Sequence, residues 1–123
     1  MQNNNVKFRD MLGKRVYSFA LNVIVFADQL PKSQASNIIG DQLLRSATSI
    51  GANVVESKSA SSRKDYANFL SYALKSANET KFWLGLLRDS GKADKEKVGL
   101  LLRETTELAK ILASSVLKLK GRG

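Results

Sequence analysis

Residues 94–119 read DKEKVGLLLRETTELAKILASSVLKL, a proline-free stretch in which apolar and small residues recur at alternating spacings of three and four. This spacing is a heptad repeat, and it predicts a helix that buries one stripe of side chains against neighbouring helices. The stripe consists of Val98, Leu101, Thr105, Leu108, Leu112, Ser115 and Leu119. A helix of this kind needs helical partners from the rest of the chain.

Three further segments show helical periodicity. From residue 14 to residue 30 apolar side chains recur every three or four positions, and Pro31 then stops the helix. Two more helices are predicted over residues 33–57 and 62–91, because each segment starts at a serine that can act as an N-cap and Gly91 can end the second. An aspartate three residues after the second of these serines approximates a capping box.

Short connections make neighbouring helices antiparallel, so the four segments predict an all-α fold, an up-down-up-down antiparallel four-helix bundle. The 123 residues suffice for one such domain, and the single proline leaves almost the whole chain free to be helical. We expect the domain to span residues 1–123, with flexible ends at 1–12 and 120–123. In this topology both chain ends lie at the same pole of the bundle.

Small residues share one face of the second predicted helix, at Gly40, Ala47 and Gly51. A glycine inside a helix costs about 1 kcal/mol relative to alanine, so these glycines need a structural reason. Their size lets another backbone approach closely, either from a helix of the same chain or from a second subunit. Both alternatives stay open, and the three positions are the candidate oligomer interface.

The chain contains no histidine and no cysteine. These absences remove the usual general base, thiolate nucleophiles and the ligands of most zinc sites, and helical di-metal sites also require histidine. We therefore predict no catalytic residue, no metal and no cofactor. The N-terminus lacks the apolar run of a secretory signal and no apolar stretch reaches the length of a membrane span, which predicts a cytoplasmic protein without a membrane partner.

The formal net charge is +9, from 20 Lys and Arg against 11 Asp and Glu. The predicted topology concentrates the excess at the pole that holds both chain ends, which we call the basic pole. Concentrated like charge costs self-repulsion that an anionic ligand relieves, although each single residue could also serve solubility or a helix dipole. We predict phosphate contacts by Lys14, Arg15, Lys58, Arg63, Lys64, Lys118, Lys120 and Arg122.

Residues 42–56, QLLRSATSIGANVVE, resemble the signature segment of the bacterial four helix bundle protein family, also called the ribosomal RNA intervening-sequence protein family. The similarity continues through the third predicted helix and residues 100–112, and it covers nearly everything from Val16 to Leu117. The chain has Glu56-Ser57 where the family often has Glu-Gly. The polar positions that match the family, with a structural role implied, are Arg45, Asn53, Glu56 and Glu79.

Ion pairs are the expected role of most of these polar residues. Arg45 and Glu79 should face one another across the second and third helices, and Glu56 should meet Arg63 or Lys64 across the intervening turn.

The resemblance implies a four-helix protomer that assembles into a ring-shaped homopentamer and has no catalytic residues. A related protein, the accessory variability determinant of diversity-generating retroelements, partners a reverse transcriptase and RNA. We therefore expect a non-enzymatic, oligomeric RNA-binding or ribonucleoprotein-associated protein, with RNA favoured over DNA and a reverse transcriptase or ribosomal RNA as a partner. The alternative is a scaffold or adaptor for a protein partner, in which the charge serves attraction or solubility.

Overall fold

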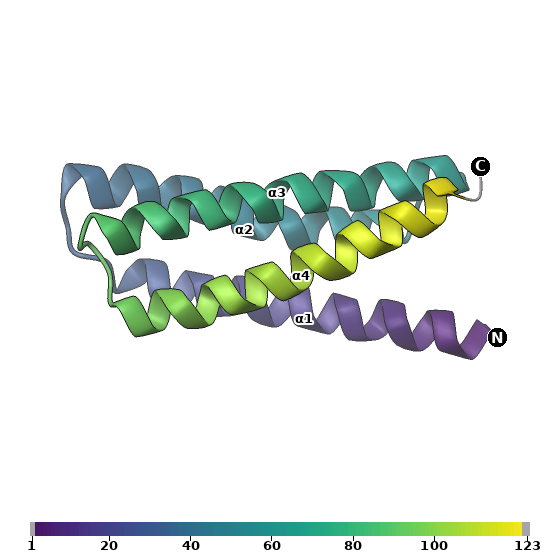
Figure 1. The fold of residues 1–123 in the computed structure, drawn as a ribbon, viewed down its shortest axis with the longest axis horizontal. Helices are drawn as coiled ribbons and strands as arrows, with labels where there is room; N and C mark the ends of the chain where they lie inside the picture. The colour runs from purple at the N-terminus through teal and green to yellow at the C-terminus, as the bar shows by residue number, and fades with distance from the viewer. Residues whose placement is uncertain (1, 122–123) are drawn as a thin grey trace.

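Four long helices make up the computed structural model, which describes residues 2–121 and the side chains of residues 6–121. They are α1 (Gln2–Asp28), α2 (Gln34–Ser57), α3 (Arg63–Asp89) and α4 (Lys95–Gly121). Successive helices run in opposite directions, and the start of α1 lies at the same pole as the end of α4 (Figure 1). The predicted all-α, up-down-up-down four-helix bundle is therefore confirmed.

The predicted helix starts at Ser33 and Ser62 are also confirmed. The Ser33 hydroxyl accepts a hydrogen bond from the Ser36 amide at 3.1 Å, and the Ser62 hydroxyl accepts one from the Asp65 amide at 3.0 Å. The Asp65 carboxylate accepts from the amide of Ser61 rather than from that of Ser62. The Ser62 hydroxyl thus satisfies one orphan amide of α3, whereas Asp65 bonds the residue before the N-cap and does not close the capping box.

Gly91 ends α3 in the left-handed conformation, with φ of 73°. The amide of Lys92 donates to the carbonyl of Leu87 at 3.0 Å, and the amide of Gly91 donates to that of Arg88 at 3.1 Å. These two bonds form a Schellman motif, in which glycine carries the positive φ at the least cost. By contrast, α2 ends without such a residue, since no described residue after its C-cap Lys58 and before α3 has a positive φ.

The hydrophobic core follows the predicted stripes, with one extension. α1 begins at Gln2 instead of residue 14, and Leu12, inside the segment expected to be flexible, is only 2% exposed. The cause is visible in the spacing, because Phe8 and Leu12 continue the stripe of Val16 at intervals of four residues. The segment expected to be flexible is therefore helical from Gln2 onward, and its flexibility stays a prediction.

The small-residue face of α2 packs against α1 of the same chain. A side-chain carbon added at Gly51 would lie 3.6 Å from the carbonyl oxygen of Val16, and one at Gly40 would lie 3.3 Å from a methyl group of Leu30. Ala47 is fully buried within the protomer. These contacts favour the alternative of intrachain packing, and the oligomer interface at Gly40, Ala47 and Gly51 stays a prediction.

Candidate nucleic-acid interface

An open cleft with a volume of about 850 Å³ lies at the basic pole. On the way to this pole α4 moves away from α1 and approaches α3 (Figure 1). The N-terminal half of α1 and the C-terminal half of α4 form its two sides. The end of α2, the following turn and the start of α3 close it from behind.

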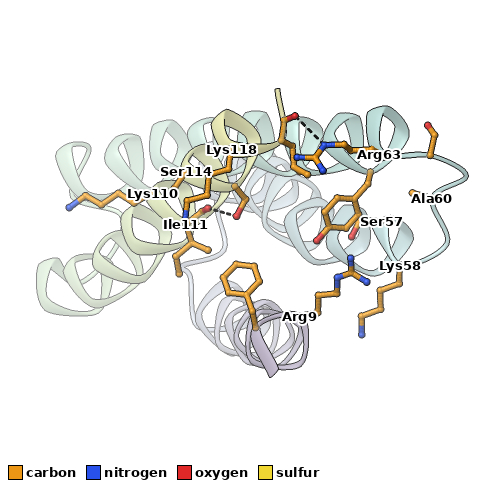
Figure 2. Close-up of a pocket in the computed structure, with 14 residues that line it drawn as sticks. Arg9, Ser57, Lys58, Ala60, Arg63, Lys110, Ile111, Ser114 and Lys118 are labelled. Carbon is orange, nitrogen blue, oxygen red and sulfur yellow. Dashed lines mark hydrogen bonds between the residues drawn. The ribbon is translucent and has the colours of Figure 1, made fainter. Parts of the chain in front are cut away.

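The charged side chains that line the cleft are all cationic. Among the residues that the structure describes, no aspartate or glutamate lines it. The cations come from all four helices or their ends, and they are Arg9, Lys58, Arg63, Lys110 and Lys118 (Figure 2). A concave surface that gathers one sign of charge focuses its field and attracts the opposite sign.

Local contacts position three of these cations. The Arg63 guanidinium donates through Nε to the carbonyl of Leu119 at 3.3 Å, which joins the start of α3 to the last turn of α4 (Figure 2). The Lys58 amine reaches α1, where a side-chain carbon added at Gly13 would lie 3.6 Å from it. The Arg9 guanidinium carbon lies 5.0 Å from the ring centroid of Tyr66, within cation–π range.

Apolar and hydroxyl groups form the remaining lining. Phe8, Tyr66, Ile111 and Leu119 are half-buried against the core, and Ala60 lies in the turn behind them. The hydroxyl groups belong to Ser57, Ser62, Ser114 and Ser115. The cleft therefore combines cations with apolar surface.

The structure brings part of the predicted phosphate-binding set together. Lys58, Arg63 and Lys118 line the cleft. Three more predicted residues are exposed on the same pole but do not line the cleft, namely Lys14, Lys64 and Lys120. Arg122 lies outside the described residues.

Arg15 is the exception within the predicted set, because it has an intrachain partner. Its Nε and Nη2 donate to the two carboxylate oxygens of Glu104 at 3.0 and 2.6 Å, both groups being about one-third exposed. The hydrogen bond to Glu104 raises the pKa of Arg15 further, against the opposing effect of burial. This bidentate pair joins α1 to α4 and gives Arg15 a structural role, while its phosphate contact stays a prediction.

Two of the lining cations, Arg9 and Lys110, are absent from the predicted set. Arg9 falls in the segment expected to be flexible, and Lys110 lies in the middle of the bundle by sequence. The available signal was the spacing of four residues from Lys110 through Ser114 to Lys118, which places these polar groups on one face of α4.

The predicted pair of Arg45 and Glu79 is confirmed, and it joins α2 to α3. The indole Nε1 of Trp83 also donates to the Glu79 carboxylate at 2.9 Å. Hydrogen bonding from Trp83 has the largest effect and lowers the pKa of Glu79; burial opposes it, and the contact with Arg45 lowers the pKa further. Asn53 donates to the carbonyl of Ser49 within its own helix at 2.9 Å, which agrees with a structural role.

The expected pair of Glu56 with Arg63 or Lys64 does not form. Glu56 is exposed, and the ion pairs within 4.0 Å among the described residues involve other carboxylates. Arg63 instead donates to the carbonyl of Leu119 at the end of α4. Within residues 6–121, no group of three or more acidic side chains gathers in a way that would hold a metal ion.

The described helices define a basic, all-α four-helix bundle, and none of them is long and apolar enough to cross a membrane. The chain belongs to the 23S rRNA-intervening sequence protein family, whose profile matches residues 12–114. This membership confirms the family resemblance of the sequence. A search among curated proteins found no match.

A solved structure supports the same assignment. It is the 1.70 Å crystal structure of a protein with unknown function from the S23 ribosomal protein family of Bacteroides thetaiotaomicron VPI-5482. The two chains are 35% identical, the similarity covers 88% of this chain and 96% of that one, and the TM-score is 0.82.

Proposed function

We propose that this chain is a non-enzymatic, cytoplasmic RNA-binding protein that contacts phosphates through the cleft at the basic pole. The observation that carries the proposal is the lining of five cations without a carboxylate among the described residues. Phosphate contacts supply most of the affinity of proteins for nucleic acids. The name of the family, which refers to an intervening sequence of 23S rRNA, favours RNA over DNA. Ribosomal RNA, or RNA bound to a reverse transcriptase, is the partner that we propose.

The test is the salt dependence of binding to a single-stranded RNA. If five cations neutralise phosphates, log K should fall against log salt with a slope of about −3.5. Replacing Lys58, Arg63 and Lys118 by glutamine should weaken binding and flatten the slope to about −1.4, because each lost contact removes about 0.7. Fluorescence anisotropy at several salt concentrations measures both quantities.

The matched control is the glutamine triple variant of Lys92, Lys95 and Lys97, which removes the same charge near the connection of α3 and α4 at the opposite pole. It should leave the slope unchanged and weaken binding only slightly. Equal losses in the two variants would mean that net charge alone drives binding. Absence of RNA binding by the unaltered chain would favour the alternative of a scaffold or adaptor for a protein partner.

We also propose that the protein works as a closed homo-oligomer, with the pentamer implied by the family resemblance as the favoured state. The supporting feature is an apolar outer face on α1, where Tyr17, Leu21 and Ile24 are 68%, 48% and 42% exposed. Their spacing places them on one side of the helix, away from the core stripe. Exposed apolar groups that gather in this way commonly mark protein contacts.

The unaltered chain should therefore show about five times the protomer mass of 13.5 kDa in light scattering. Replacing Leu21 and Ile24 together by glutamate should give monomers. The reason is that assembly would bury two carboxylates that have no cationic partner, which is unfavourable. The same change at Ile38 and Val55, which are exposed on α2, is the control and should preserve the assembly. A monomer mass for the unaltered chain would contradict the proposal.

A further inference from the structure

The cleft contains more apolar surface than phosphate contacts alone require. Binding of the phosphates in a nucleic-acid backbone needs cations on the protein. A flat or convex basic surface also supplies such cations. Here Phe8 and Tyr66 lie half-buried between the cations, together with aliphatic side chains from α4. Accessible apolar surface beside cations suits a ligand that is itself part apolar and part anionic.

Tyr66 and Arg9 form a stacked pair within this lining. The guanidinium carbon of Arg9 lies 5.0 Å from the centroid of the Tyr66 ring. Unpaired bases stack on aromatic rings and on guanidinium planes, since each base offers a flat π-face. Phe8, one residue before Arg9, adds a second aromatic side chain from α1. Two aromatic rings and a guanidinium group therefore lie within one cleft.

The hydroxyl groups have remaining capacity to contact a nucleotide. Ser57 and Ser115 donate their hydroxyl protons to the carbonyls of Val54 and Ile111, at 2.6 and 2.9 Å. A hydroxyl oxygen that donates in this way can still accept hydrogen bonds. Acceptors in these positions suit the ribose 2′-hydroxyl or the amino groups of a base.

The size of the cleft restricts which nucleic-acid structures can use all of these groups. A volume of about 850 Å³ lies in the range of sites for small molecules and nucleotide-sized groups. In a duplex the bases are stacked and paired, so only its backbone could meet the cationic rim. An unpaired strand can instead turn a base inward while its phosphates stay on the cations at the edge.

We propose that the cleft binds unpaired nucleotides of RNA, with a base against Tyr66 and Phe8 and the adjoining phosphates on Arg9, Lys58 and Arg63. This inference rests on the proposed function and extends it, because it makes the cleft selective for single strands. The basis for selection is the contact of the base with aromatic surface, which a backbone alone cannot make.

The test compares three probes of equal length. They are a single-stranded RNA, the same sugar-phosphate strand without its bases, and the duplex of the RNA sequence. Stacking of one base contributes about 1–3 kcal/mol, so the intact strand should bind about tenfold more tightly than the abasic strand. Tyr66→Leu combined with Phe8→Leu should remove this difference, because it keeps apolar volume and removes the rings. Tyr66→Phe alone should retain it.

The outcomes separate this inference from the function on which it rests. Equal affinity for the intact and abasic strands, with the salt slope preserved, would overturn the base contact and leave phosphate binding in place. Binding of the duplex as tightly as the single strand would also overturn it. If the unaltered chain bound none of the three probes, both proposals would fail. Far-ultraviolet circular dichroism shows whether the leucine variants keep their helices.

Discussion

Leu12→Ala is expected to lower the free energy of unfolding by about 2–5 kcal/mol, although Leu12 lies in a segment that the sequence predicts to be flexible. The reason is that Leu12 is 2% exposed and belongs to the main core cluster. Truncation removes buried methyl groups and leaves a cavity that the long helices can only partly close. The loss is large against the total stability of a small domain, which is about 5–15 kcal/mol. Urea denaturation followed by circular dichroism measures it.

Met11→Ala is the control, because it truncates the preceding residue, which is 40% exposed. Its effect should remain within about 0.5 kcal/mol, as is usual for a surface substitution. Equal and small effects of the two substitutions would contradict the packing of residues 6–12 on the core.

The start of α1 illustrates a boundary that periodicity alone does not set. Much of the segment before residue 14 is polar, and α1 already includes Gln2, the first residue that the structure describes. The other boundaries were predictable because a serine or glycine with a specific backbone role stands at them, as at Ser33, Ser62 and Gly91. Phe8 and Leu12 could be recognised as core residues only by extending the apolar stripe of residues 14–30 toward the N-terminus.

The sequence predicted at which pole of the bundle the candidate site lies, but it did not predict that the site is a cleft. Topology and charge together identified the end of the bundle, because they depend only on helix order. The cleft depends on the angle at which α4 leaves α1, and no pattern within a single helix encodes that angle (Figure 1). Arg15 shows the same limit, since its partner Glu104 stands 89 residues away in the sequence.

The cleft also extends beyond the part of the chain that the family profile matches. The matched residues end at 114 and begin at 12, whereas Arg9, Lys118 and Leu119 line the cleft from outside these limits. The four-helix core is therefore the feature that this chain shares with its family by sequence.

The effect of a substitution at Gly51 on the free energy of unfolding should change sign with the size of the new side chain. Gly51→Ala should be neutral or raise the free energy of unfolding by up to about 1 kcal/mol, because alanine is the better helix former. Its added carbon would lie at an ordinary contact distance of 3.6 Å from Val16. Gly51→Leu should instead lower it by about 1–3 kcal/mol, because the additional atoms meet the backbone of α1.

The leucine variant also distinguishes the two roles that the small-residue face of α2 allowed. Ala52→Leu adds the same side chain at the next, exposed position and should change stability by less than about 0.5 kcal/mol. Thermal unfolding measures the stabilities, and light scattering of each variant measures its assembly. If Gly51→Leu dissociated an oligomer while the protomer kept its stability, the face would be a subunit contact. We expect the protomer itself to lose stability, because the carbonyl of Val16 that the new side chain meets belongs to the same chain.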